Sequence, residues 1–213
     1  LTHIIELFPF MLIAHLGATL AGESETARRE VERLSLTDDV TGLNNMRNFF
    51  LLSESQEKVA KRYIRPFSIC MIDADNLKNI NDRYGHFAGT KLIQQVARMI
   101  TAHIRSSDIC ARYGGDEFVI MFTESGREDV INAVERIISG MASTPFDFEG
   151  ESITTTLSAG LAGYPGDGGD VRTIMANADE AMYVSKRTGK NRLTVFSEIM
   201  YGETFGRGEN RPR

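Results

Sequence analysis

The middle of the chain alternates between short apolar runs and longer amphipathic stretches. The short runs are rich in β-branched and aromatic residues and end at turn-forming residues, a pattern that predicts β-strands. The predicted strands cover residues 67–72, 109–113, 117–122, 152–162 and 192–196. In the stretches between them, apolar residues recur three and four positions apart, which predicts helices with one buried face. The predicted helices run from Met46 to the residue before Pro66 and over 90–104, 127–140 and 171–187, with a short helical turn at 76–82.

From residue 67 onward, single strands alternate with helices, and one pair of strands has no helix between its members. That pair flanks Gly114-Gly115, which predicts a tight hairpin because glycine reaches positive φ at little cost. This order predicts an α+β fold of the ferredoxin-like palm kind, with a mostly antiparallel central sheet flanked by helices.

Residues 4–21 form an apolar stretch that Glu6, Pro9 and His15 interrupt. It lacks the uninterrupted length of a clear membrane span and the basic start of a signal peptide, although it fits the end of a final membrane helix. Across the end of this stretch and the charged segment that follows, mostly apolar residues recur at alternating spacings of four and three positions, as in a heptad seam. The seam consists of Leu20, Ser24, Ala27, Val31 and Leu34. A helix packed on its own domain and a parallel two-helix stalk explain it equally well.

Three parts of the chain are therefore expected. They are an N-terminal helical segment at 1–35, one globular domain at 36–200, and a glycine-rich, charged and disordered tail at 201–213. The formal net charge is −5 and no basic stripe is visible, which argues against general nucleic-acid binding. A nucleotide ligand would have to bind at a local site. Cys70 and Cys110 lie in predicted strands without a spacing motif, so buried free thiols in a reducing cytosol are expected.

Acidic residues stand where predicted strands begin or end. Asp116 and Glu117 follow the glycine turn directly, and neighbouring side chains on a strand point to opposite faces, so at least one is available to a cation. On its own, this turn also fits a solvated acidic hairpin. Asp73 directly follows the apolar run 67–72, where an uncompensated carboxylate costs on the order of several kcal/mol. A cation or a cage of hydrogen bonds would compensate it.

Asp75 stands immediately before the predicted helical turn that begins at Asn76. Aspartate is a favoured N-cap residue, so we expect its side chain to cap that helix.

Several motifs in one order resemble the GGDEF family of diguanylate cyclases, which has a nucleotidyl-cyclase palm fold. The resemblance covers about residues 36–196. Its motifs are Gly114-Gly115-Asp116-Glu117-Phe118, the upstream segment from Asp73 to His86, and Ala178-Asp179-Glu180-Ala181-Met182-Tyr183 with Lys186 to Asn191.

The resemblance implies a nucleotidyltransferase that binds purine nucleoside triphosphates with two Mg²⁺ ions, or Mn²⁺, in each active site. Two domains meet as a homodimer and produce a cyclic dinucleotide and pyrophosphate, with GTP as substrate. Asp73 and Asp116 match the metal ligands, and the Ala74 carbonyl is an expected backbone ligand. Glu117 matches an acid that assists metal binding or proton removal, and the sequence does not separate these two roles.

The resemblance also implies a set of nucleotide-binding residues. They are Leu77, Lys78, Asn81, Thr90, Gly114, Gly115, Lys186 and Lys190. Lys186 and Lys190 are four residues apart, so we expect them on one helical face, where they can meet the β- and γ-phosphates. The family more often has arginine at the second position. A basic last turn favoured by the helix dipole is compatible with this role.

Thr90 departs from the family pattern, which usually has aspartate at this position, directly after the glycine that corresponds to Gly89. Aspartate accepts hydrogen bonds from N1–H and N2–H₂ of guanine, whereas a hydroxyl both donates and accepts. A subgroup of the family has serine here and is associated with cyclic GMP-AMP. Thr90 therefore favours relaxed base selection, with ATP used beside GTP, while a strict cyclic di-GMP product is the alternative.

Arg105 and Asp108 match the family's product-inhibition motif upstream of the glycine turn, whereas the alternative is an exposed ion pair. A further alternative is an inactive effector that binds a cyclic dinucleotide at these residues. The intact signature argues against inactivity. The catalytic domain is expected in the cytoplasm, with attachment to the inner membrane if the segment before Gly22 ends a membrane helix.

Overall fold

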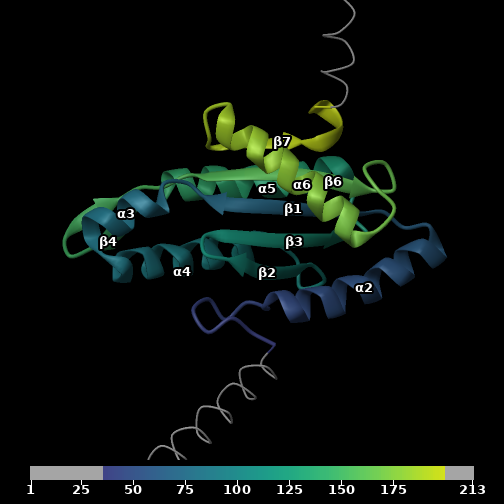
Figure 1. Cartoon of the computed structure of the whole chain (residues 1–213), viewed down its shortest axis with the longest axis horizontal. Helices are drawn as coiled ribbons and strands as arrows, with labels where there is room; N and C mark the ends of the chain where they lie inside the picture. Colours follow the sequence, from purple (N-terminus) through teal and green to yellow (C-terminus); the bar gives the residue numbers. More distant parts are fainter. Residues whose placement is uncertain (1–35, 200–213) are drawn as a thin grey trace, which may run out of the picture. The chain divides into compact units, whose positions relative to one another are not determined.

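The computed structural model describes residues 36–199 (Figure 1). The expected membrane segment, the heptad seam and the C-terminal tail lie outside these residues. Within the described part of the chain, no helix is long and apolar enough to cross a membrane.

A five-stranded sheet forms the centre of the fold, with the strand order β2-β3-β1-β6-β7. Its strands are β1 (Phe67–Ala74), β2 (Ile109–Gly114), β3 (Glu117–Thr123), β6 (Leu157–Tyr164) and β7 (Arg192–Val195). All neighbouring strands are antiparallel except β6 and β7, which pair in parallel. The predicted mostly antiparallel sheet flanked by helices is confirmed.

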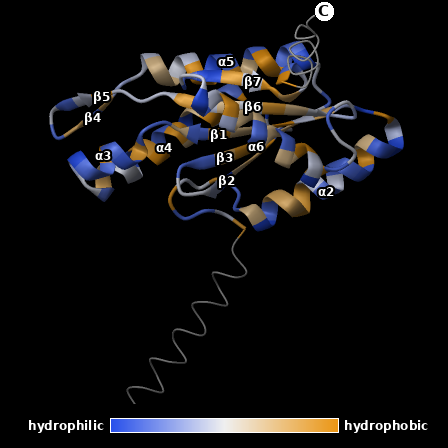
Figure 2. Cartoon of the chain, turned by 45° about the horizontal axis from the view of Figure 1, so that its top comes forward, coloured by the Kyte–Doolittle hydropathy of each residue, from blue (hydrophilic) through white to orange (hydrophobic). Residues whose placement is uncertain are grey.

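Between residues 46 and 187, five helices accompany the sheet, and Figure 2 shows hydrophobic and hydrophilic residues side by side along them, as expected for amphipathic helices. They are α2 (Met46–Tyr63), α3 (Leu77–Tyr84), α4 (His86–His103), α5 (Arg127–Ser143) and α6 (Val171–Arg187).

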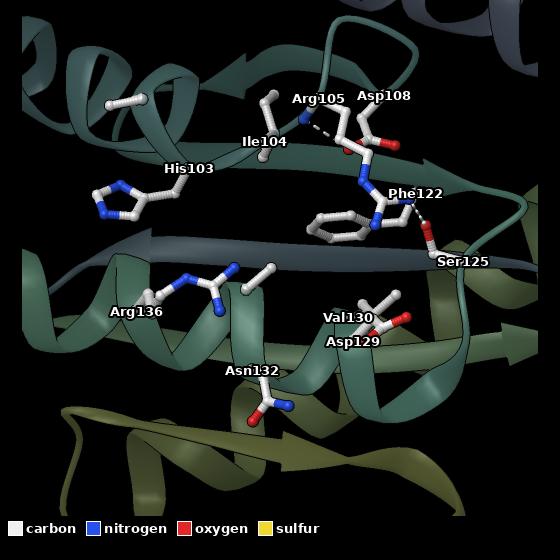
Figure 3. A pocket seen from close by; sticks show the side chains of 12 residues that line it. His103, Ile104, Arg105, Asp108, Phe122, Ser125, Asp129, Val130, Asn132 and Arg136 are labelled. Carbon is white, nitrogen blue, oxygen red and sulfur yellow. Dashed lines mark hydrogen bonds between the residues drawn. The ribbon is translucent and has the colours of Figure 1, made fainter.

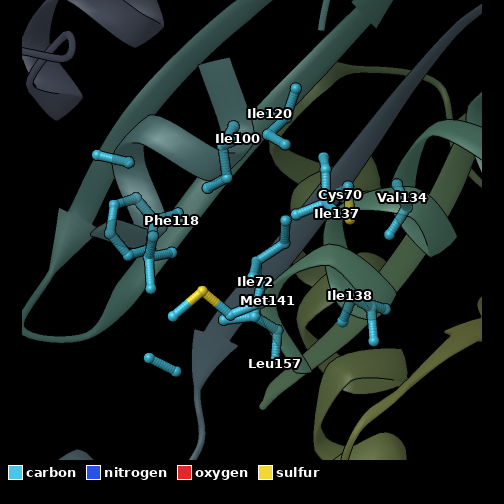
Figure 4. Close-up of a cluster of buried hydrophobic side chains, with 14 of the residues drawn as sticks. Cys70, Ile72, Ile100, Phe118, Ile120, Val134, Ile137, Ile138, Met141 and Leu157 are labelled. Atoms are coloured by element: carbon cyan, nitrogen blue, oxygen red, sulfur yellow. The ribbon is translucent and has the colours of Figure 1, made fainter. Parts of the chain in front are cut away.

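The apolar run of β1 divides its side chains between two cores, because successive residues of a strand point to opposite faces. Ile69 and Met71 belong to a cluster with residues of α2 and α6. Cys70 and Ile72 belong to a second cluster with residues of α4 and α5. Figure 4 shows the second cluster, in which Ile72 lies among residues of both these helices. Helices on both faces therefore bury all eight residues of β1, including Asp73 at its end.

The second predicted helix begins earlier than residue 90. A single residue, Gly85, separates the two helices. It has a φ of 83° and is both the C-cap of α3 and the N-cap of α4. Helix α4 then begins at His86 and incorporates Gly89, which packs against α3.

The predicted strand 152–162 is wrong as one continuous element. The structure has a short strand β5 (Glu151–Ile153), paired with β4 (Phe146–Phe148), and then β6 from Leu157. The alternating pattern is interrupted because Thr155 and Thr156 use their hydroxyls to bind Asp75.

Gly160 of β6 allows α6 to pack directly on the sheet. An ideal Cβ built at Gly160 would lie 2.1 Å from both the Ala178 carbonyl oxygen and the Met182 nitrogen, which are backbone atoms of α6. These atoms cannot rotate away, unlike the end of a flexible side chain. Any larger residue would therefore push away the helix that carries Lys186.

We expect Gly160→Ala to lower the free energy of unfolding by about 2–3 kcal/mol, because overpacking forces a backbone shift. Urea unfolding measures this change. Gly166→Ala is the matched control, since a Cβ there meets no atom within 4 Å. Equal stability of the two variants would contradict the close-packing argument.

Candidate functional site

The glycine turn joins β2 and β3 and leaves open space above its backbone. Gly115 has a φ of 52°, and the register of the two strands shifts between Arg112 and Gly114. A Cβ at Gly114 or Gly115 would meet no atom within 4 Å. The Arg112 guanidinium fixes the turn by donating two hydrogen bonds to the Gly115 carbonyl, at 3.0 and 2.7 Å. The turn is therefore held from one side and open to a ligand on the other.

Arg112 also connects the turn to the start of the described chain. Its guanidinium forms a salt bridge with Asp38 at 3.2 Å, and its backbone N–H donates to the Asn44 carbonyl. Hydrogen bonds from Thr41 and the charge of Arg112 outweigh burial and lower the pKa of Asp38. This contact could not be predicted from the sequence, because nothing in residues 36–45 indicates which strand they cross.

Asp73 lies at the end of β1, directly opposite Glu117 of β3. It is 7% exposed, and its carboxylate forms a salt bridge with the Lys186 ammonium at 2.7 Å. The Ala74 N–H donates to the Asp116 carbonyl at 3.1 Å, which places the backbone of Asp116 beside the same strand end. The structure thus brings together the acids of two motifs and the lysine of a third.

The charges in this cluster shift one another's pKa values. Burial raises the pKa of Asp73 to about 6, with added repulsion from Asp116 and Glu117, although the contact with Lys186 opposes the rise. The pKa of Glu117 is also raised, first by burial and then by the charges of Asp179 and Asp116. Burial lowers the pKa of Lys186, but the surrounding carboxylates outweigh this effect and raise it. Two acids with raised pKa values beside one ammonium group form an environment that favours an additional cation.

The acids of this cluster do not form a complete metal cage by themselves. Within residues 36–199, no three acidic, histidine or cysteine side chains are grouped closely enough to hold an ion. Mg²⁺ in phosphoryl-transfer sites is commonly held by one or two carboxylates together with substrate phosphates. Asp73 and Asp116 fit that donor set. An open cleft of about 290 Å³ beside Glu117, bordered by Tyr113 and Asp179, leaves room for a substrate group.

Asp75 does not cap a helix, and that expectation is wrong. The N-cap residue of α3 is Asn76, which has a φ of 64° and whose side chain makes no capping hydrogen bond. The Asp75 carboxylate is 1% exposed and accepts hydrogen bonds from the hydroxyls of Thr156 and Ser158, at 2.6 and 2.7 Å. These partners are far away in the sequence, so a local capping argument could not find them.

Lys186 and Lys190 do not share a helical face. Helix α6 ends at Arg187, and Lys190 lies beyond it with a left-handed backbone, at a φ of 60°. Both ammonium groups nevertheless reach the end of β1. Lys186 contacts Asp73, and Lys190 donates a hydrogen bond to the Asn76 side-chain oxygen at 2.7 Å.

Helices α3 and α4 meet closely at the predicted base-contacting residues. A Cβ at Gly89 would lie 2.0 Å from the Asn81 amide oxygen and 3.1 Å from a Leu77 methyl group, so a larger residue here would displace the Asn81 side chain. The Thr90 hydroxyl donates to the His86 carbonyl at 3.0 Å and retains its acceptor lone pairs. Lys78 is exposed on the first turn of α3.

Arg105 and Asp108 line a separate cavity of about 370 Å³ (Figure 3). Asp108 accepts hydrogen bonds from the N–H groups of Arg105 and Thr123, at 2.9 and 3.2 Å. The Arg105 guanidinium donates to the Ser125 hydroxyl at 3.3 Å. No side-chain ion pair between Arg105 and Asp108 occurs among the salt bridges of the described residues.

Four more polar side chains line this cavity, and no local sequence pattern assigns them to it. Asp129, Asn132 and Arg136 come from one face of α5, and His103 comes from the end of α4. Their three- and four-residue spacing on α5 was a readable signal. The position of this α5 face opposite Arg105 depends on the packing of α5 on α4, which the sequence does not reveal.

Comparison with known proteins identifies the family. Residues 35–192 match the family model described as diguanylate cyclase, GGDEF domain. The bifunctional diguanylate cyclase/cyclic di-GMP phosphodiesterase MucR of Pseudomonas aeruginosa is 35% identical over 86% of this chain and 27% of its own length. Diguanylate cyclase DosC of Escherichia coli K12 is 36% identical over 81% of this chain and 36% of its own length. The chain thus spans well under half the length of these relatives.

Solved structures give the same result. The GGDEF domain of DgcB from Caulobacter crescentus, in complex with c-di-GMP, is 30% identical, with a TM-score of 0.72 over 76% of this chain and 96% of that one. The GGDEF domain of PA1120 from Pseudomonas aeruginosa is 29% identical, with a TM-score of 0.73 over 78% of this chain and 99% of that one. With the family model matching well over half of its residues, the chain belongs to the GGDEF family of diguanylate cyclases.

Proposed function

We propose that this protein is a dinucleotide cyclase that joins two purine nucleoside triphosphates into a cyclic dinucleotide second messenger and releases pyrophosphate. The observation that carries the proposal is the buried Asp73 carboxylate, which lies opposite Glu117 and within 2.7 Å of Lys186 beside the open glycine turn. Carboxylates next to an ammonium group suit a metal-bound triphosphate. GTP is the proposed substrate, because the relatives are named diguanylate cyclases.

The chemistry requires two domains in a homodimer, each holding one nucleotide. The 3′-oxygen of one nucleotide forms a bond to the α-phosphorus of the other, and the bond to the departing pyrophosphate breaks. The 3′-oxygen of the second nucleotide then attacks the α-phosphorus of the first in the same way and closes the ring. Two pyrophosphates therefore leave for each cyclic product. The cleft beside Glu117 is the proposed approach for the partner's ribose.

Residues of this chain have separate proposed roles in binding metal, binding phosphate and accepting a proton. Asp73 and Asp116 would hold two Mg²⁺ ions, or Mn²⁺, together with the Ala74 carbonyl, and the bound ions would supply positive charge to the phosphoryl group. Lys186 and Lys190 bind the β- and γ-phosphates. Glu117, whose pKa is raised, is the proposed acceptor of the 3′-hydroxyl proton.

Base selection is the second part of the proposal. The Thr90 hydroxyl donates its hydrogen bond to the His86 carbonyl, so its oxygen is available to a ligand as an acceptor. A single acceptor accommodates the N6–H₂ group of adenine as well as N1–H or N2–H₂ of guanine. We infer relaxed selection, with cyclic GMP-AMP formed beside cyclic di-GMP. Strict cyclic di-GMP synthesis is the second candidate, because relatives and a ligand-bound neighbour carry that nucleotide in their names.

The cavity at Arg105 is the proposed site of product inhibition. Arg105 and Arg136 line it with the hydrogen-bonding side chains of His103 and Asn132, which suits a phosphodiester with purine bases. The cavity is built from β3, α4 and α5, whereas the catalytic cluster contacts α6, so product at this site would act at a distance from the reacting groups.

Asp116→Asn should reduce pyrophosphate release from GTP with Mg²⁺ at least a hundredfold, since it removes a proposed metal ligand. Binding of cyclic di-GMP at the Arg105 cavity should be unchanged. Asp147→Asn, an exposed change on β4, is the control and should retain full turnover. Undiminished turnover by Asp116→Asn would refute the assigned role.

Thr90→Asp should narrow the product range. With equal GTP and ATP, mass spectrometry of the wild-type products should detect cyclic GMP-AMP. In Thr90→Asp, its ratio to cyclic di-GMP should fall at least tenfold, because a carboxylate disfavours adenine. If the wild-type protein makes only cyclic di-GMP from the mixture, the proposal of relaxed base selection is wrong and the protein is a strict cyclic di-GMP synthase.

Arg105→Ala should prolong product formation. Progress curves of the wild-type protein should bend as product accumulates, and those of the variant should remain linear to higher yield. Arg98→Ala, an exposed change on α4 away from the cavity lining, should behave as wild type. Identical curvature in all three proteins would exclude inhibition through this cavity.

A further inference from the structure

The loop that follows α6 holds a sequence of unusual backbone conformations. Gly189, Lys190 and Asn191 have φ values of 119°, 60° and 49°. Lysine and asparagine seldom adopt left-handed φ in succession, since only glycine does so without strain. Such a conformation persists only where surrounding contacts determine it.

Another left-handed residue, outside this loop, is hydrogen-bonded to it. Asn76, at the junction of β1 and α3, has a φ of 64°. Two hydrogen bonds join the segments. The Lys190 ammonium donates to the Asn76 side-chain oxygen at 2.7 Å, and the Asn191 N–H donates to the Asp75 carboxylate at 3.3 Å. We call these four residues, Asp75, Asn76, Lys190 and Asn191, the clasp.

Asp75 anchors the clasp to the sheet. Besides Asn191, its carboxylate accepts from Thr156 and Ser158, and its backbone N–H and carbonyl bond to the Thr156 carbonyl and the Thr155 hydroxyl. One buried carboxylate therefore ties the end of β1, the start of β6 and the loop after α6. Both of its carboxylate oxygens accept from hydroxyl or N–H groups of the protein, whereas Asp73 contacts the Lys186 ammonium through one oxygen.

Lys190 has a long, flexible side chain, so a contact that restrains it makes phosphate binding more favourable. A lysine side chain loses much rotamer freedom when it binds a phosphate, and it lacks the preformed fork of arginine. Asn76 accepts one of its three ammonium hydrogens and leaves two for a ligand. The contact restrains the side chain before a ligand arrives, which lowers the entropic cost of binding.

We propose that Asp75 and Asn76 are positioning residues that hold Lys190 ready for the terminal phosphates of the nucleotide. The inference rests on the proposed function, because it assumes that a nucleoside triphosphate binds beside Asp73. Asp75 sets the loop conformation through Asn191, and Asn76 orients the ammonium group. Neither side chain touches the reacting atoms.

The test compares a triphosphate with a monophosphate. Isothermal titration calorimetry measures the binding of GMP and of GTP with a methylene bridge between its α- and β-phosphates, both with Mg²⁺. Asn76→Ala and Asp75→Asn should each weaken the triphosphate analogue about tenfold, in line with loss of a hydrogen bond to a charged group. GMP affinity should change less than twofold, because GMP has no terminal phosphates.

A double-mutant cycle shows whether the effect passes through Lys190. In a Lys190→Met background, Asn76→Ala should weaken the triphosphate analogue less than twofold further. Two matched controls should leave affinity unchanged. Asn79→Ala removes an exposed asparagine on the same helix, and Ser185→Ala removes a buried hydroxyl that bonds to β6 and β7 but not to the clasp.

Three results would overturn the proposal. Tighter triphosphate binding by Asn76→Ala would mean that Asn76 competes with the phosphates for Lys190. Equal losses for GMP and the triphosphate analogue would indicate a general structural role. A full tenfold loss in the Lys190→Met background would show that Lys190 is not the intermediary. If the wild-type protein binds neither ligand and releases no pyrophosphate, the proposed function itself fails.

Discussion

The site depends on a buried carboxylate at the end of a central strand. Asp73 is placed there because β1 lies between two layers of helices that cover its apolar residues on both faces. A charge in this position is unfavourable unless it is compensated, and Lys186 of α6 supplies the compensation at 2.7 Å. Helix α6 approaches closely enough because Gly160 lets its backbone pack on β6. The catalytic proposal therefore has its origin in the packing of one helix on the sheet.

Other contacts hold the ligand-facing segments around Asp73 without occupying it. Arg112 fixes the glycine turn through the Gly115 carbonyl, and the clasp fixes the loop that carries Lys190. Gly115 adopts positive φ at little cost, whereas the left-handed backbone of Asn76 and Lys190 is strained, and the segments that carry all three contact the end of β1 or the residues that follow it. Such concentration of unfavourable conformations is typical of a site that is preorganised for a ligand.

The sequence allowed prediction of features whose cause is local. Residue types along one turn predicted the hairpin at Gly114-Gly115. Residue types along one strand predicted that Asp73 is a carboxylate at the end of a buried strand and needs compensation. Features with partners far along the chain were mispredicted or missed. Asp75 was expected to cap a helix because its partners Thr156 and Ser158 belong to a different strand. The α5 wall of the Arg105 cavity was missed because it depends on helix packing.

In the proposed reaction, two copies of this domain meet, each with its own nucleotide. The most direct measurement is specific activity, as pyrophosphate released from GTP with Mg²⁺, over a wide range of protein concentration. Specific activity should rise with concentration and level off once dimer formation is complete. Turnover that stays constant on dilution to the lowest detectable concentration, in a protein that is monomeric there, would contradict it.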